Sequence, residues 1–413
     1  MDISIERLLD MPVVRVLSSE MNEREISIQV ELSQHHSICH KCGQKATEYV
    51  RAGETLRLRH LPIFNRPVYL YLHTKRYRCL NCEDHPTTTQ HGDWYDSDAH
   101  CTKAFAEFLL LEMINSTPQD VARKHGASYD ILRGLLDRYV DAKVDWKKIK
   151  QLRDIGIDEI SRLKGHRDFV TIVSTHDQQG RPALLAVLEG REKATVLAFL
   201  KSIPKRLRNQ VEQVCIDLYE GFANAVKEAL PNAKVVADRF HVAKLYRAAV
   251  DALRKSEMKE LKRALKPEEY AGLKGVMWLL RRKSEDLTTE ELAVLELLFE
   301  CSSALRKAHQ LREKLTAIFE AQHTKESATV AIRAWIKEVQ RSGLDCFDKF
   351  LGTLENWMDE ITNYFISRLT SGWVEGFNNK IKVLKRRCYG LTSIPNFFRR
   401  LWLDLHGFEA FTH

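Results

Sequence analysis

The stretch Val211–His241, "VEQVCIDLYEGFANAVKEALPNAKVVADRFH", decides the fold of the central part of the chain. It begins with the strand-like run "VEQVCIDL", continues with a helical pattern from Phe222 to Leu230, and returns to a strand in "AKVVADRF". A strand, a helix and a second strand in this order predict a parallel crossover. Asp217 stands at the end of the first of these two strands.

Three further strands are predicted before this stretch, in "IGIDEI", "DFVTIVST" and "PALLAVLEG". No helical pattern separates them, so they predict an antiparallel meander. A helix around Ala194 to Leu200 then leads to the crossover. A meander followed by a parallel crossover is the order found in RNase H-like folds, and we expect that fold for residues 151–240.

Two acids lie where this sheet would bring them together. Asp158 lies in the first strand and Asp217 ends the fourth, and these strands are neighbours in an RNase H-like sheet. Two carboxylates a few ångströms apart raise each other's pKa unless cations lie between them, which makes them natural ligands for Mg²⁺. The pattern leaves alternative ligands if the strand register differs by a few residues: Asp154, Glu159 and Glu220.

A third acid is found in "SGWVEGFNNKIKVLKRRCYG", residues Ser371–Gly390. Five of the eight residues from Lys380 to Arg387 are basic, and Glu375 precedes them. On helical spacing one face holds Glu375, Asn379, Lys382 and Arg386. We therefore expect the helix to bind the DNA backbone through Asn379, Lys382, Lys385 and Arg386, while Glu375 completes a two-metal site. The alternative is that the helix dipole alone favours a Glu early in the helix.

Two CxxC pairs predict a structural zinc site in the N-terminal region. Residues 11–101 alternate as strands do, with Val68, Leu70 and Leu72 opposite the intervening polar and aromatic side chains. The pairs "CHKC" and "CLNC" supply four thiolates, Cys39, Cys42, Cys79 and Cys82, which suit a tetrahedral Zn²⁺ site. We expect the nearby histidines His40, His85 and His91 to be surface residues rather than ligands.

The stretch "STPQDVARKHGASYDILRGLLDRYV" has the pattern of a helix-turn-helix. Ser116 or Thr117 is the predicted N-cap of a short helix, Gly126 ends it, and Ser128 caps the second helix. The residues expected to face DNA are Arg123, Lys124, Tyr129 and Arg133. Helix pairs of this size also occur in protein cores, which is the alternative interpretation.

Composition places few limits on function. The chain has 413 residues, of which 44% are hydrophobic and 29% charged, enough for two or three domains. The formal net charge of +8 suits a polyanionic partner but also many other proteins. We find no run of 18 apolar residues and no signal segment, so we expect a cytoplasmic protein with no membrane partner.

The predicted organisation is multidomain, α+β and α/β. Residues 241 to about 350 are almost wholly helical in pattern, and we expect Trp278 within them and Trp373 beyond them to be core residues. The alternative for Trp373 is that it stacks on a DNA base. The expected domains are a β-rich zinc ribbon (1–101), a helix-turn-helix (102–150), the first part of an RNase H-like core (151–240), an all-helical insertion (241–350) and the last core helices (351–413).

These motifs together resemble a known family. The stretches "IGIDEIS", "VCIDLYEGFANAV", "PNAKVVADRFHVAKLY" and "SGWVEGFNNKIKVLKRRCYG", behind a zinc ribbon and a helix-turn-helix, are similar to the L3 family of bacterial insertion-sequence transposases. These are DDE enzymes with an RNase H-like core, and the resemblance covers nearly the whole chain. It implies that Asp158, Asp217 and Glu375 are catalytic, and that the helical block is an insertion before Glu375.

The resemblance also implies an activity. A transposase of this kind binds terminal inverted repeats, hydrolyses a phosphodiester with Mg²⁺ or Mn²⁺, and joins the freed 3′-OH to target DNA. We expect a homodimer or larger assembly on DNA, in a bacterial cytoplasm and associated with the nucleoid. The alternatives are a DNA-binding regulator with an inactive RNase H-like domain and a metal-dependent nuclease without strand transfer.

One further motif, "DRFH", covers Asp238 to His241. It fits the DxxH pattern of transposases with a helical insertion. Asp238 and His241 are therefore possible accessory residues. His241 would either act near the active site or tie the core to the insertion.

Overall fold

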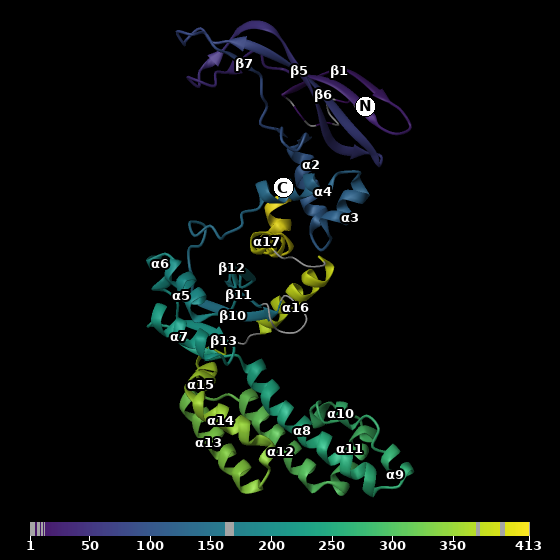
Figure 1. Cartoon of the computed structure of the whole chain (residues 1–413), viewed down its shortest axis with the longest axis vertical. Coiled ribbons are helices and arrows are strands. Elements are labelled where there is room, and N and C mark those ends of the chain that lie inside the picture. The colour runs from purple at the N-terminus through teal and green to yellow at the C-terminus, as the bar shows by residue number, and fades with distance from the viewer. Residues whose placement is uncertain are drawn as a thin grey trace. The chain divides into compact units, whose positions relative to one another are not determined.

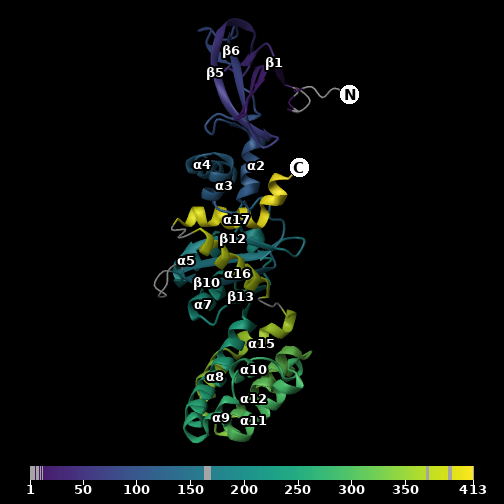
Figure 2. The ribbon, with the colours of Figure 1, turned by 90° about the vertical axis from the view of Figure 1, so that its right-hand side faces the viewer.

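The computed structural model describes residues 5, 9, 11, 13–161, 169–368, 372–388 and 393–412, without the side chains of 372–375, 377 and 378. The chain separates into two compact units, which Figures 1 and 2 show in two views. The first unit comprises Met1–Ala142 with Arg399–His413, and the second comprises Lys143–Phe398. Each unit is described by itself below.

A twisted sheet forms the N-terminal part of the first unit. Its strand order is β1-β2-β6-β5-β9-β8, and β7 pairs with β6. Val68, Leu70 and Leu72 of β6 are fully buried, which confirms the predicted alternation. The strands are β1 (Val14–Met21), β2 (Ile26–Leu32), β5 (Glu48–Ile63), β6 (Arg66–Arg78), β7 (Thr87–Thr89), β8 (Tyr95–Asp96) and β9 (Cys101–Thr102), and a separate pair is formed by β3 (Ser37–Ile38) and β4 (Lys45–Ala46).

Three helices follow the sheet: α2 (Lys103–Met113), α3 (Pro118–His125) and α4 (Tyr129–Tyr139). Of the two predicted N-caps of α3, Thr117 is the one that accepts a hydrogen bond from the backbone of Asp120. Gly126 ends α3 in the left-handed region, at φ 60°, and Ser128 caps α4. The helix-turn-helix geometry therefore follows from local capping residues that the sequence shows.

The C-terminal part of α17 (Ile394–Phe411) belongs to the same unit from Arg399 onwards. Leu403 is fully buried in the core that α2, α3 and α4 form. Arg400 is 2% exposed and donates hydrogen bonds to the carbonyl oxygens of Met113, at 2.9 Å, and Ser116, at 2.7 Å. The last helix of the chain thus holds the end of α2 and the turn that precedes α3.

A five-stranded sheet organises the second unit, in the order β12-β11-β10-β13-β14. The first three strands are antiparallel, whereas β13 and β14 are parallel to β10, so the predicted RNase H-like order is confirmed. The strands are β10 (Asp154–Ser161), β11 (Phe169–His176), β12 (Pro182–Glu189), β13 (Gln213–Ile216) and β14 (Lys234–Ala237), and the helices between them are α5 (Lys193–Ser202), α6 (Lys205–Arg208) and α7 (Glu220–Ala229).

The remainder of the second unit is helical, as the composition predicted. Its first helix, α8, begins two residues after the last residue of β14, and Figure 1 labels α8 beside the other helices of this region. The helices are α8 (Arg239–Ala264), α9 (Pro267–Ala271), α10 (Val276–Leu279), η1 (Ser284–Asp286), α11 (Thr289–Cys301), α12 (Ser303–Glu320), α13 (Lys325–Ser342), η2 (Asp345–Phe347), α14 (Asp348–Asn356), α15 (Met358–Ser367) and α16 (Gly372–Arg387). None of the helices described could cross a membrane, given their length and hydropathy.

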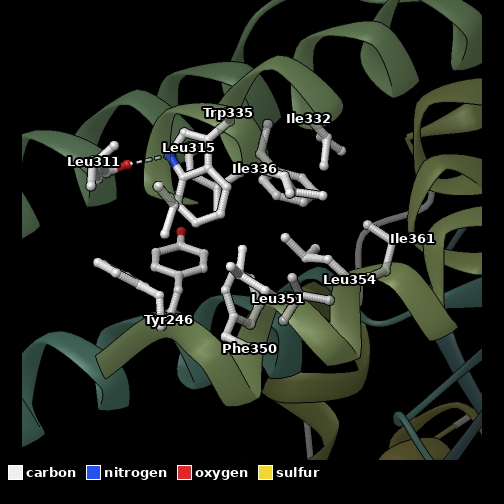
Figure 3. Close-up of a cluster of buried hydrophobic side chains, with 14 of the residues drawn as sticks. Tyr246, Leu311, Leu315, Ile332, Trp335, Ile336, Phe350, Leu351, Leu354 and Ile361 are labelled. Carbon is white, nitrogen blue, oxygen red and sulfur yellow. Dashed lines mark hydrogen bonds between the residues drawn. The ribbon is translucent and has the colours of Figure 1, made fainter. Parts of the chain in front are cut away.

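One hydrophobic core joins the helical region to the sheet. Tyr246 of α8 belongs to one cluster with residues of α12, α13, α14 and α15, which Figure 3 shows. The indole Nε1 of Trp335 donates a hydrogen bond to the carbonyl oxygen of Leu311 at 2.8 Å. Val236 and Ala237 of β14 belong to the same cluster. The start of α8 is therefore fixed to the edge of the sheet by shared packing.

The expectation that Trp278 is a core residue is wrong. Its side chain is 62% exposed, and the guanidinium carbon of Arg281 lies 5.3 Å from the centre of its ring. The short helix α10 buries Val276 and Leu279 instead, and a residue between these two positions points away from the core. The side chain of Trp373 lies outside the part of the chain that the structure describes.

Candidate active site and zinc centre

Three aspartates lie in a row across the sheet of the second unit. The register pairs Ile157 of β10 with Ile216 of β13, and Ile216 with Ala237 of β14. The residue that follows each of these three is an aspartate: Asp158, Asp217 and Asp238. Because the three strands are parallel, their carboxylates gather at one edge, as the sequence predicted for the first two.

His241 joins this row from the first turn of α8. Its Nδ1 lies 2.8 Å from an Oδ of Asp217 and 2.9 Å from an Oδ of Asp238. Asp238 is also the N-cap of α8 and accepts a hydrogen bond from the backbone of Phe240. One ligand atom from each of Asp158, Asp217 and His241 lies within 4.8 Å of the others, a spacing that could hold a metal ion.

The electrostatics of the cluster favour a bound cation. Asp158 is 6% exposed, and its burial together with the neighbouring Asp217 raises the pKa of Asp158 to about 8. Burial lowers the pKa of His241, but its hydrogen bonds with Asp217 and Asp238 outweigh burial and raise that pKa to about 10. The single positive charge of His241 therefore does not balance the negative charge of the neighbouring carboxylates. Carboxylate oxygens with an unbalanced negative charge are suitable ligands for a divalent cation.

The alternative acids differ in their surroundings. Asp154 pairs with His176 on β11, and Glu159 pairs with Arg191 at 3.2 Å. Glu220 is exposed in the first turn of α7. The structure therefore brings Asp158 and Asp217 together and gives Asp154 and Glu159 basic partners of their own.

A cleft of about 1070 Å³ opens over the aspartates. Two groups of basic residues line it: Lys244 and Arg247 of α8 with Arg281 after α10, and Lys382, Lys385 and Arg386 of α16. The second group was predicted from the basic run. The first group was missed, although the spacing of Lys244 and Arg247 after His241 places all three on one helical face.

Helix α16 packs against β10 and β12, with Ile381 and Leu384 fully buried. The Nζ of Lys385 donates a hydrogen bond to the carbonyl oxygen of Ser161 in β10. Asn379 is exposed and is not among the described residues that line the cleft. The backbone of Glu375 is part of α16, but its side chain does not belong to the part of the chain that the structure describes.

The four predicted zinc ligands come together in the first unit. Their sulfur atoms are 3.6 Å apart for Cys42 and Cys79, 3.8 Å for Cys79 and Cys82, and 3.9 Å for Cys39 and Cys82. A tetrahedron with Zn–S bonds of about 2.3 Å has edges of about 3.8 Å. Backbone N–H groups of Cys42 and Lys41 lower the pKa of Cys39 to about 7. This four-cysteine cluster fits Zn²⁺.

The nearby histidines are not part of the four-cysteine cluster. His40 and His85 are exposed, and the Nδ1 of His40 lies 2.9 Å from the hydroxyl of Thr88. His91 is exposed and packs beside Tyr95.

The residues predicted to face DNA in the helix-turn-helix are all at the surface. Arg123 and Lys124 are exposed in the last turn of α3. Tyr129 is 47% exposed at the start of α4, and Arg133 is exposed one turn later. These four side chains are therefore free of the core.

Comparisons with known proteins agree with this organisation. A family model described as "Transposase", that of the ISL3 DDE transposases, matches residues 155–401, and one described as "zinc-finger of transposase IS204/IS1001/IS1096/IS1165" matches residues 36–82. The transposase for insertion sequence element IS1001 of Bordetella parapertussis is 28% identical over 393 residues, 94% of each chain. The transposase for element IS1557 of Mycobacterium tuberculosis is 26% identical over 389 residues, which cover 89% of this chain and 86% of that protein.

Proposed function

The chain belongs to the ISL3 family of insertion-sequence DDE transposases, and from this premise we propose that Asp158, Asp217 and Glu375 are its catalytic acids. The observation that carries the proposal is the placement of Asp158 and Asp217 side by side on neighbouring strands, at the edge of a cleft with basic walls. Both residues, and Glu375, lie inside the range that the transposase model matches.

The position of Glu375 supports its assignment. Lys382 and Arg386, seven and eleven residues later on α16, line the cleft that holds the aspartates. At 100° per residue these intervals bring position 375 within about 20° of both on the helix surface. We therefore assign the third carboxylate to position 375.

We assign Mg²⁺ or Mn²⁺ to these three carboxylates. Two divalent ions, when bound, activate the attacking oxygen and stabilise the leaving oxygen of a phosphodiester. The protein's part is to hold the buried Asp158 level with the half-buried Asp217. His241 keeps Asp217 and Asp238 in place through its Nδ1 and links them to α8, which makes it a positioning residue.

The reaction has two steps. In the first, a water oxygen bonds to phosphorus at the element's end and the bond from phosphorus to the 3′ oxygen breaks, which leaves a 3′-OH and a 5′-phosphate. In the second, that 3′-OH attacks a phosphodiester of target DNA and a target 3′ oxygen leaves. Neither step needs a redox partner, and Lys382, Lys385 and Arg386 bind the DNA backbone during both.

The remaining parts of the chain select the DNA. The exposed face of α3 and α4, with Arg123, Lys124, Tyr129 and Arg133, reads the terminal inverted repeats, and the zinc ribbon supports end binding. We propose that the protein acts as a homodimer or larger assembly, since an element has two ends. The proposed domains are those expected above: 1–101, 102–150, 151–240 with 351–413, and the insertion 241–350.

The test incubates the protein and Mg²⁺ with DNA that carries the element's two ends and sequences the products. We expect cuts at the ends and joined products for the wild type, and neither for Asp158→Asn or Asp217→Asn, because an amide keeps the shape but loses the charge. Glu220→Gln, one turn after Asp217 and exposed, is the control and should cut normally. Normal cutting by either Asn variant would remove that aspartate from the site.

A further inference from the structure

The helical insertion supplies one wall of the cleft. On α8, the residues that line the cleft lie about one helical turn apart, singly or as adjacent pairs: Phe240 and His241, Lys244, Arg247 and Ala248, and Asp251. This spacing keeps them on one face of the helix. From His241 to Arg247 the helix rises about 9 Å, which equals the rise of two to three nucleotides of one DNA strand. The stripe begins at the histidine that contacts Asp217.

Arg281 reaches the same wall from another segment. Arg312 of α12 is 4% exposed and donates hydrogen bonds to the carbonyl oxygens of Leu280 and Arg282, both at 2.9 Å. These bonds fix the backbone on either side of Arg281. The guanidinium of Arg281 lies over the exposed ring of Trp278 and 3.7 Å from Asp251 of α8. Arg281 is therefore held beside the α8 stripe while its side chain stays 47% exposed.

Arg281 has a protein partner in Asp251, but the other two cations of this wall have none. Lys244 and Arg247 are exposed, and neither forms an ion pair with any residue that the structure describes. Two exposed cations without ion-pair partners on the cleft wall are available to bind an anionic group that enters the cleft.

A neighbouring groove of about 600 Å³ shares Arg247 and Arg281 with the cleft but differs in its charge balance. There Glu320 pairs with Lys283 at 2.9 Å and with Arg239 at 3.5 Å, and Glu313 pairs with Arg312 at 3.4 Å. Of the two cations without a partner, Lys244 lines only the cleft, whereas Arg247 lines both the cleft and the groove. The cleft therefore has more unpaired positive charge than the groove.

We propose that Lys244, Arg247 and Arg281 form a second phosphate-binding wall, which holds the backbone of the DNA strand in the active-site cleft opposite α16. The proposal rests on the proposed function, since it assigns the DNA in that same cleft. It gives the insertion a direct part in DNA binding. The strand would lie between two basic walls, with the carboxylates between them.

The test measures the salt dependence of DNA binding by the full-length protein, without added Mg²⁺, for the double variant Lys244→Gln/Arg247→Gln. Each lost phosphate contact makes the slope of log K against log[NaCl] shallower by about 0.9 on duplex DNA, so we expect a change of about 1.8. Adding Arg281→Gln should change it by about 0.9 more. The control, Lys259→Gln/Lys262→Gln, removes two exposed charges with the same spacing on the same helix, away from the cleft, and should keep the wild-type slope.

A double variant with the wild-type slope would overturn the proposal of a second wall. A control variant whose slope changed as much as that of the double variant would also overturn it. Circular dichroism melting of each variant confirms that the substitutions leave the fold intact. Cutting by the wild-type protein is scored separately with Mg²⁺. If the wild-type protein never cuts but the double variant has a shallower slope, the DNA-binding wall is supported and the proposed reaction is refuted. If the wild-type protein cuts and the double variant has the wild-type slope, only the proposal of the wall is refuted.

Discussion

Asp158 and Asp217 lie level on two neighbouring parallel strands, because the residues before them, Ile157 and Ile216, are paired in the sheet. The two carboxylates come from strands that are separated in sequence by β11, β12 and the helices α5 and α6. Their proximity is therefore a property of the sheet register, and burial together with the neighbouring Asp217 raises the pKa of Asp158 to about 8. The predictions below begin from this pair and move outward.

Glu375→Gln should abolish cutting while it leaves binding to the element's ends within about twofold of the wild type. The amide keeps the size of the side chain but removes the charge that a divalent ion requires. Single-turnover cleavage and binding isotherms on the same DNA measure both quantities. Glu355→Gln, exposed on α14, is the matched control and should cut normally. Wild-type cutting by Glu375→Gln would mean that another residue supplies the third carboxylate.

Replacing Cys39 or Cys79 with Ser should release one zinc ion per chain and unfold the ribbon, because a structural site supplies much of the folding free energy of a small module. The RNase H-like core should remain folded. Metal analysis and limited proteolysis check the two statements. Cys215→Ser is the control, since Cys215 is buried in β13 and not in the four-cysteine cluster. Zinc-free wild-type protein, prepared without chelators, would contradict the assignment.

Neutralising Lys382, Lys385 and Arg386 should weaken binding to all DNA and make the salt slope shallower by about 2.7, because three phosphate contacts are lost. Changing Arg133 or Tyr129 to Ala should instead reduce the preference for the terminal repeats, by about 1–3 kcal/mol for each good base contact. Isotherms on terminal-repeat and scrambled duplexes at several salt concentrations separate the two effects. If the triple variant lost only its preference for the terminal repeats and kept its affinity for scrambled DNA, the placement of the DNA backbone beside α16 would be refuted.

His60 should make the stability of the first unit depend on pH. Burial lowers the pKa of His60 to about 4, and its Nδ1 lies 2.9 Å from the hydroxyl of Thr102. The unfolded chain therefore binds the proton between pH 6.5 and pH 4, and the folded chain does not. Stability should be full above pH 6.5 and fall by up to about 2 kcal/mol at pH 5. Urea unfolding of the wild type and of His60→Gln at pH 7.5 and pH 5 measures the difference, which should be smaller for the variant.

Arg400→Met should lower the free energy of unfolding of the first unit by about 3 kcal/mol. The carbonyl oxygens of Met113 and Ser116 would lose their donor, and the buried Asp404, 3.7 Å away, would lose a counter-charge. Adding Asp404→Leu should restore part of the loss, since no unpaired buried charge then remains. Urea unfolding of the single and double variants tests this. An unchanged midpoint for Arg400→Met would show that the ion pair contributes nothing.

Local patterns in the sequence were enough to predict the helices and strands and to identify the four zinc ligands. Capping residues such as Thr117 and Gly126 act within a few residues of themselves, and a CxxC pair places both sulfurs on one turn. The meander and the crossover followed from the order of strands and helices. Asp158 and Asp217 could be proposed as partners because a known strand order brings their strands together.

The sequence alone determined the four cysteines that could bind zinc and predicted acids for metal ions and one basic run for DNA, because those capacities belong to side-chain chemistry and short-range spacing. Only the tertiary structure decided which of them share a site. The packing of α8 against β14 brings His241 to Asp217 and carries Lys244 and Arg247 into the cleft, and Arg312 fixes Arg281 beside them. Trp278 was misjudged for the same reason. Whether an apolar residue is buried depends on partners distant in sequence, and no local pattern contains them.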